Sequence, residues 1–517
     1  MDNSKSQQWQ RISPVAIIYF VQALVRSVLG NVVYILPALL ILYSKVEENP
    51  GLWWPVIYSG VTLILLSAIL SFYFFQYRLT EQQIEIRSGV FARKYIDLPF
   101  AKIQNVELAE PFYYRPFNYC CMQFDTAGSA RQEAKIVAVH KPFAIQLKQQ
   151  ILASQKNKSI SLEQTESLTS DTESTTSSTH NEADEVILDR RNLDDLVIHG
   201  LTNNRIWLIL AGLMPFIDGL LDKVGAWSAY WGITFDQYFE FTDKSFWQIA
   251  STFLTLFITI MLFISILSIL GAIIMFHDFK LSRYEDKYIR RSGFFTRTEV
   301  TMRLSRLQKI VCQQSWLDVL LRRSNLKFEQ SNANHQTPES HAQNNRIIVP
   351  SVTHKERDHL IQDAFNEVNI TEIAFNNVSR RLFLRNMMLI VIPVTTFITY
   401  MLITHSNPNA FSISAACGLV ITALFYLRYR RWGWATDDKY IYIRNGWLGV
   451  NYYIFQRFKV QQVHFMQSWF LQRRQLCSVQ MVLASGAISV PYINQHQGYQ
   501  WLDETLFDVE STRKNWM

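Results

Sequence analysis

The stretch SGVFARKYIDLPFAKIQNV, from Ser88 to Val106, decides the fold because the chain repeats its pattern. The stretch SGFFTRTEVTMRLSRLQKI runs from Ser292 to Ile310, and NGWLGVNYYIFQRFKVQQV runs from Asn445 to Val463. The three copies align without a gap, and each follows a long apolar segment. The 517-residue chain therefore contains three related units, and any assignment of the fold must begin from this internal repeat.

Five positions carry the same kind of residue in every copy. Relative to a shared glycine, they are an arginine two residues earlier, a cation 13 residues later, a glutamine 15 later and an aromatic residue 23 later. In the order of the copies, the glycines are Gly89, Gly293 and Gly446, the arginines Arg87, Arg291 and Arg444, the cations Lys102, Arg306 and Lys459, the glutamines Gln104, Gln308 and Gln461, and the aromatics Phe112, Trp316 and Trp469.

Each repeated position has a structural and a functional interpretation. We expect the glycines in hairpin turns and the aromatic residues in the core. A buried glutamine can satisfy backbone groups at a strand edge, and ligand binding is the alternative. The two sets of cations are candidates for binding lipid phosphates at the membrane surface. Pairing with nearby carboxylates, or a solvated face, is the alternative for them.

The sequence of each unit predicts several β-strands followed by one helix. Aromatic and aliphatic residues alternate with polar ones at 77–87, 280–291 and 435–444, which predicts strands before the glycine turn. Further short strands are expected after it, near 122–124, 135–139, 346–349 and 479–483, and amphipathic helices at 142–152, 355–365 and 496–507. Several short strands closed by one helix predict a small, partly open β-barrel with a C-terminal helical cap.

Six apolar segments approach the length of about 20 residues that spans a bilayer. The first lies within 15–43, with Arg26 inside it; we expect an interfacial helix followed by a span from about Leu29. The others run at 53–75, 206–221, 246–276, 387–403 and 413–427. They form three hairpins, so the predicted class is a membrane protein with helical spans and β-rich domains.

Charge distribution orients the hairpins. Only 18% of the residues are charged, against about 25% in soluble proteins, and the net charge is +7. The connections inside the hairpins are short or acidic, whereas basic residues follow each hairpin. Because positive residues stay in the cytoplasm, we expect both termini and all three domains to be cytoplasmic. The excess positive charge follows from this topology, and nucleic acid is not an expected partner.

The pattern resembles the bacterial pleckstrin-homology-like (PH-like) domains of YdbS/YdbT-type membrane proteins. Their phrase I-P-L-x-R/K-I-Q-x-V is matched best between Ile96 and Val106; the third copy lacks the proline, and the second has a polar insertion at 331–345. The resemblance covers nearly the whole chain, because such hairpins also precede these domains in the family. It implies the bacterial inner membrane and a cell-envelope or membrane-stress role. It also implies a smaller membrane protein of the same family as a partner.

These observations divide the chain into seven parts. The stretch from Ser154 to Glu185 is rich in serine, threonine and acids and has no Phe, Trp or Tyr, which predicts a disordered linker. The expected parts are 1–75 with hairpin 1, 76–153 as domain 1, 154–190 as linker, 191–276 with hairpin 2, 277–366 as domain 2, 367–427 with hairpin 3, and 428–517 as domain 3.

The sequence contains no motif of a known catalytic or metal site, so we expect a non-catalytic protein without a cofactor. The favoured hypothesis is a scaffold whose domains bind protein segments, lipid headgroups or each other, including as a homo-oligomer. A transporter or lipid-handling protein, with a path between the hairpins, is the alternative. For that reason we single out Arg26, which we expect to reach the headgroups, and His199, which we expect to pack or hydrogen-bond at the membrane interface.

Overall fold

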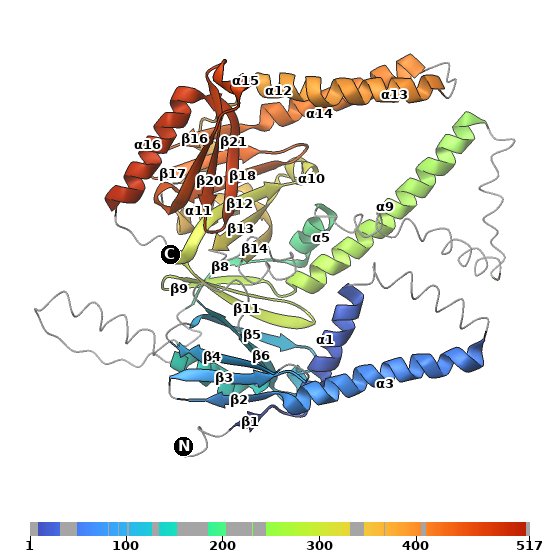
Figure 1. The fold of residues 1–517 in the computed structure, drawn as a ribbon, viewed down its shortest axis with the longest axis vertical. Helices are drawn as coiled ribbons and strands as arrows, with labels where there is room; N and C mark the ends of the chain where they lie inside the picture. Colours follow the sequence, from blue (N-terminus) through green and yellow to red (C-terminus); the bar gives the residue numbers. More distant parts are fainter. Residues whose placement is uncertain are drawn as a thin grey trace, which may run out of the picture.

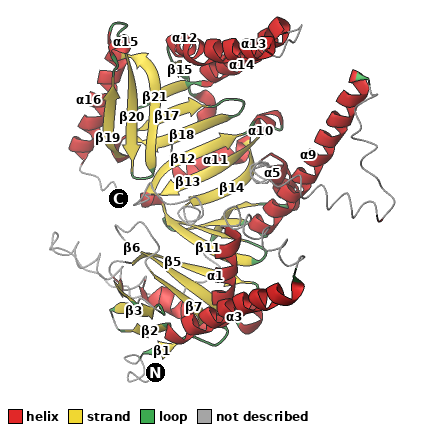
Figure 2. Ribbon diagram, turned by 45° about the vertical axis from the view of Figure 1, so that its right-hand side comes forward, coloured by secondary structure: helices red, strands yellow, loops and turns green. Residues whose placement is uncertain are grey.

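The structure of the chain is a computed structural model. It describes residues 9–30, 49–80, 82–90, 93–100, 103–126, 134–151, 185–202, 230, 245–330, 346–366, 368–404 and 410–512. Three β-rich units are stacked along the long axis, with unit 1 at the N-terminal end and unit 3 at the C-terminal end (Figure 1). The long helices leave this stack on one side, as both views show (Figures 1 and 2).

Within the described residues, four helical stretches are long and apolar enough to cross a membrane: Trp53–Phe74, Ala250–Phe276, Arg381–Thr404 and Phe411–Arg431. They belong to α3 (Pro50–Phe74), α9 (Phe246–Phe276), the run from α12 (Arg381–Asn386) to α13 (Ile392–Thr404), and α14 (Ala410–Arg431). Most of their apolar side chains face outward, as they do in contact with lipid. These helices confirm four of the six expected spans; the span from Leu29 and the span at 206–221 lie outside the described residues.

A short strand precedes each hairpin, and the sequence did not reveal it. β1 (Gln10–Arg11), β8 (Val186–Arg190) and β15 (Asn376–Asn377) pair with β2 (Gln76–Leu79), β9 (Lys280–Tyr284) and β16 (Gly433–Thr436), the first strands after the hairpins. Each segment expected as a hairpin is thus inserted between the first two strands of its unit. The expected boundaries at 75, 276 and 427 separate strands that pair, and the linker assigned to 154–190 includes β8.

The other strands extend the pattern of the repeat. Each stretch expected as one strand before the glycine is a hairpin of two. In chain order, the remaining strands are β3 (Gln83–Ser88), β4 (Lys94–Pro99), β5 (Ile103–Pro111), β6 (Tyr119–Thr126), β7 (Ala134–His140), β10 (Lys287–Ser292), β11 (Thr296–Arg303), β12 (Leu307–Gln314), β13 (Arg323–Gln330), β14 (Arg346–Thr353), β17 (Tyr440–Asn445), β18 (Val450–Gln456), β19 (Val460–Met466), β20 (Leu476–Leu483) and β21 (Gly486–Asn494). The expected closing helices are confirmed by residues 141–151, by α11 (His354–Ala364) and by α16 (Gln495–Thr512).

The sheets run across the units. The two seven-stranded sheets have the orders β7-β6-β5-β11-β10-β9-β8 and β14-β13-β12-β18-β17-β16-β15. Each joins the three-stranded half of one unit to the four-stranded half of the next. The end sheets are β1-β2-β3-β4 in unit 1 and β19-β20-β21 in unit 3. The predicted barrel is therefore wrong in one respect: each unit has two open half-sheets, because neighbouring units occupy the strand edges that closure would need.

The shared glycines occupy the turns that the sequence predicts. Gly89 and Gly293 have φ angles of 105° and 119°, a region that favours glycine. A Cβ atom on Gly293 would lie 2.1 Å from the carbonyl oxygen of Thr296, so no other residue fits this turn without strain. The backbone N–H of Gly293 also donates to the carbonyl of His277, at the end of α9. The turn is therefore fixed to the base of a membrane helix.

Candidate functional site

The three shared arginines hold the strands that precede the hairpins. The guanidinium of Arg87 lies 3.6 Å from the centre of the Trp9 ring. Arg291 forms two hydrogen bonds with the Glu185 carboxylate, of 2.6 and 2.9 Å. Arg444 lies 4.8 Å from the centre of the Phe375 ring. The shared arginine thus meets an aromatic ring in units 1 and 3 and a carboxylate in unit 2.

The partners share one position, directly before the first strand of each unit: Trp9 before β1, Glu185 before β8, and Phe375 before β15. Hydrogen bonds from Arg291 lower the pKa of Glu185, so this carboxylate is charged at neutral pH. Arg291 also bonds Glu299 at 3.0 Å. Pairing with carboxylates, the alternative to lipid binding, therefore applies to Arg291. All three arginines hold the short strand that precedes the hairpin of their unit.

The second set of cations is not equivalent in the three units. Lys459 is 3% exposed, and its Nζ donates to the carbonyl oxygens of Ser305, at 3.0 Å, and Leu307, both in unit 2. Burial lowers the pKa of Lys459 to about 8. The lipid-binding prediction is wrong for Lys459, which instead joins units 2 and 3. Arg306 lines a cavity, and Lys102 lies outside the described residues.

The cavity lined by Arg306 has a volume of about 640 Å³ and lies between the closing helix of unit 1 and the sheet of unit 2. An ion-pair chain crosses it. Lys148 of unit 1 contacts Glu299 at 2.7 Å, and Glu299 also accepts from Arg291. Burial alone would raise the pKa of Glu299, but Lys148 and Arg291 lower it to about 2. These charges are satisfied internally, so they connect units 1 and 2; lipid binding by Arg306 stays a prediction.

The shared glutamines differ in burial. Gln308 is fully buried on β12, whereas Gln461 is exposed on β19. The reason is topological, because β12 is covered by β18 of the next unit, and β19 ends its sheet. The burial expected of the shared glutamine is therefore seen for Gln308 and not for Gln461, and the expected bonding to backbone groups stays a prediction. The side chain of Gln104 lies outside the described residues.

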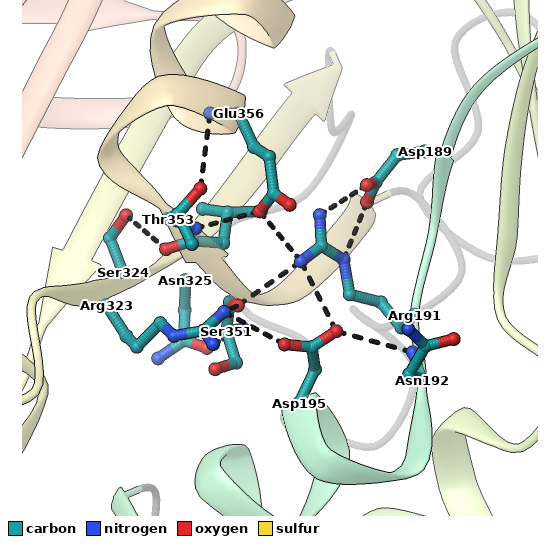
Figure 3. A network of polar contacts seen from close by, with 11 residues as sticks. Asp189, Arg191, Asn192, Asp195, Arg323, Ser324, Asn325, Ser351, Thr353 and Glu356 are labelled. Carbon is teal, nitrogen blue, oxygen red and sulfur yellow. Dashed lines mark hydrogen bonds and ion pairs between the residues drawn. The ribbon is translucent and has the colours of Figure 1, made fainter.

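A buried polar network fixes the entry to hairpin 2 (Figure 3). Arg191, between β8 and α5 (Leu193–Thr202), has a side chain that is 1% exposed. It bonds both carboxylate oxygens of Asp189, and its Nη1 donates to Glu356 at 3.0 Å and to the Ser351 carbonyl at 3.3 Å. These contacts join the pre-hairpin strand to α11 and β14.

His199 belongs to the same region. Its Nδ1 lies 2.7 Å from Oδ1 of Asn325, and its ring packs edge-on against Phe276 of α9. This confirms the packing and hydrogen-bonding interpretation of His199. Arg26 lies in α1 (Ala16–Gly30), and its side chain is outside the described part of the chain.

The shared aromatic residues are exposed, which contradicts their expected place in the core. Phe112, Trp316 and Trp469 expose 54%, 61% and 56% of their surface. They lie where the chain turns beside the base of a hairpin. Trp316 begins α10 (Trp316–Leu320), which contacts α5, and Trp469 begins α15 (Trp469–Gln472), which lies beside α12 in both views (Figures 1 and 2).

The glycine turns bring further aromatic residues to the same side. Phe294 donates its backbone N–H to Ile274 of α9, and the Phe295 ring contacts the Phe112 ring at 5.7 Å. In unit 3, the Trp447 ring contacts Phe425 of α14 at 5.1 Å. We call these exposed residues at the hairpin bases the aromatic rim: Phe112, Phe294, Phe295, Trp316, Trp447, Trp469 and Phe470.

Arginines accompany the aromatic rim. Arg473 lies 3.7 Å from the centre of the Trp469 ring, Arg428 lies 4.4 Å from that of Trp447, and Arg115 donates to the carbonyl of Phe294. These cations are not among the candidate site residues named from the sequence. A signal for Arg115 and Arg473 exists, because an arginine follows each shared aromatic residue closely, at Arg115, Arg322 and Arg473.

Comparison with known proteins agrees with this geometry. The model of the bacterial PH domain matches three segments, 17–155, 206–350 and 388–504, which together are most of the chain. The chain belongs to the bacterial PH domain family. A relative in Bacillus subtilis (strain 168), UPF0699 transmembrane protein YdbT, is 23% identical over 484 residues, which cover 92% of this chain and 93% of the relative. This supports the predicted YdbS/YdbT-type family and identifies the chain as a membrane protein with PH-like domains.

Proposed function

We propose that this bacterial PH-domain protein is a non-catalytic, multi-pass scaffold of the inner membrane, with its termini and PH-like units in the cytoplasm. The units bind lipid headgroups through the aromatic rim and its arginines. We place this scaffold in a cell-envelope or membrane-stress role, which the family resemblance implies.

The aromatic rim is the observation that carries the proposal. Tryptophan at the base of membrane helices lies at headgroup level, because its ring has an apolar body and a polar N–H, and the phenylalanines of the rim add apolar surface beside it. Arginines beside them add attraction to anionic lipids of about 1 kcal/mol each. If the shared aromatic residues had only a structural role, we would expect them to be buried in the core. Their exposure instead favours a surface that contacts the membrane.

The orientation has an independent basis in the charges. Arg428, Arg430 and Arg431 lie in the last turn of α14, at the end where the chain enters unit 3. Positive residues at a helix end favour the cytoplasmic side. The stack of units then lies on the cytoplasmic side of the membrane, because the long helices all extend from one side of the stack (Figure 1).

A quenching experiment tests the rim. Phe470→Cys, in a Cys417→Ser background, is labelled with a fluorophore in the full-length protein and placed in nanodiscs that contain nitroxide-labelled lipid. We expect strong quenching at residue 470, because 75% of Phe470 is exposed beside the membrane helices. Quenching should increase when phosphatidylglycerol is added to the nanodiscs. Arg473→Gln should lower the preference for this anionic lipid by about fivefold, because each cation near an anionic surface contributes about 1 kcal/mol.

The matched control is Asp503→Cys, an exposed position on α16. A label there should be quenched weakly with either lipid composition. Equal quenching at residues 470 and 503 would show that the rim does not lie at the membrane, and the lipid-binding proposal would then fail.

A further inference from the structure

Among the strands of the kind that join neighbouring units, two have no partner strand across the junction edge in the described part of the chain. β4 ends the sheet of unit 1, and β19 ends the sheet of unit 3. Their equivalents in the other units are paired: β11 and β18 correspond to β4, and β5 and β12 correspond to β19. Each end of the described stack therefore carries a strand with an unpaired edge, equivalent to a strand that joins neighbouring units inside the stack.

The two internal junctions use one register. Leu108 lies opposite Glu299 across β5 and β11, and Cys312 lies opposite Tyr452 across β12 and β18. Counted from the glycine of each unit, both pairs join the residue 19 positions later to the residue six positions later in the next unit. The same rule, applied once more, joins Phe465 of β19 to a residue in the position of Tyr95 on β4.

The composition of β19 fits an edge that is normally covered. Free edges are commonly protected by lysine, proline, inward charges or bulges. The sequence VQQVHFM has no Lys, Arg, Asp, Glu or Pro. Its register shift between Val460 and Gln462 recurs in β5 and β12, which are both paired, so this irregularity does not block pairing. Exposed Gln461, Gln462 and His464 lie along the strand.

We propose that β19 of one molecule pairs antiparallel with β4 of a second copy of this chain, so that the copies assemble head to tail. Phe465 then lies opposite Tyr95, and Met466 lies opposite Lys94. A second copy fits because it offers the strand that the register rule requires, with a free edge in the described residues. Repeating the internal junction also keeps the hairpins on one side, as a shared membrane demands (Figure 2).

This interface is heterologous, so each added copy leaves one β4 and one β19 free, and the assembly continues as a row or closes into a ring. The inference goes beyond lipid binding, because it concerns the ends of the stack and not the aromatic rim. Lipid quenching at residue 470 and strand pairing at residue 465 are therefore separate results.

Disulfide crosslinking in native membranes tests the pairing. Two full-length proteins, one with Phe465→Cys and one with Tyr95→Cys, are produced together and oxidised. Opposed residues on antiparallel strands lie about 4.5–5.5 Å apart, within disulfide reach. We expect a crosslinked dimer from the mixture and none from either protein alone. Because Phe465 stacks on Tyr499, the exposed pair Met466→Cys and Lys94→Cys provides a second test that does not disturb the core.

The control pair is His464→Cys with Tyr95→Cys, which lie one residue out of register and on opposite faces. Three results would overturn the proposal: a dimer from Phe465→Cys alone, which would indicate symmetric pairing of two β19 strands; a crosslink to a smaller membrane protein; or no crosslink from either matched pair in folded protein.

Discussion

Replacing Arg191 with methionine is expected to destabilise unit 2 by about 3–5 kcal/mol, the usual cost of breaking a buried ion pair from one side. The variant leaves Asp189 buried without its cation, since the Arg191 side chain is 1% exposed and bonds both oxygens of that carboxylate. It also removes the donors to Glu356 and Ser351, so β8 separates from α11 and β14. Thermal unfolding in detergent measures the loss.

Two companion variants show whether the loss comes from the buried charge. Arg190→Met changes the adjacent, exposed arginine and should shift stability by no more than about 0.5 kcal/mol. The double variant Arg191→Met with Asp189→Leu should recover part of the loss, because it removes both members of the pair. Equal effects of Arg190→Met and Arg191→Met would contradict the role given to the network.

Gly449→Ala should loosen the junction between units 2 and 3. A Cβ atom on Gly449 would lie 2.1 Å from the carbonyl oxygen of Gln314, at the end of β12 in the neighbouring unit. Such overpacking costs about 1–3 kcal/mol. We expect amide hydrogen exchange to become at least about fivefold faster in residues 307–314 and 450–456, since about 1 kcal/mol changes an opening equilibrium by that factor.

Gly271→Ala is the matched control, because a Cβ atom there meets nothing within 4 Å. It should leave exchange in both strands unchanged. Unchanged exchange in Gly449→Ala as well would mean that the end of β12 is not held against unit 3.

Local features of the fold could be read from the sequence because the repeat exposes them three times. The turn glycines, most strands after them and the closing helices follow from periodicity and from residues that tolerate one backbone conformation. The helices at 246–276 and 413–427 were predictable from apolar length alone. The short strands before the hairpins were not, because β1 and β15 have only two residues each and no pattern of their own, and β8 lies in the stretch assigned to the linker.

The candidate site was less predictable, because repetition marks a position without saying what it contacts. The arginines Arg87, Arg291 and Arg444 meet an aromatic ring or a carboxylate far away in the sequence, so their structural role needed the fold. The aromatics Phe112, Trp316 and Trp469 resembled core residues by type, yet the hairpins bring them to the surface. Lys459 is buried only because unit 2 lies against unit 3, a contact that neither unit encodes alone.

The central claim is that the units form continuous sheets in a fixed register, and one substitution tests it. Cys312 of unit 2 lies opposite Tyr452 of unit 3, so Tyr452→Cys should form a disulfide with the native Cys312 on oxidation of the full-length protein in membranes. Mass spectrometry of the linked peptides detects the bond. We expect this link from Tyr452→Cys and none from Tyr453→Cys, whose side chain lies on the opposite face of the strand. A link from Tyr453→Cys, or from neither, would show that the units do not share this sheet.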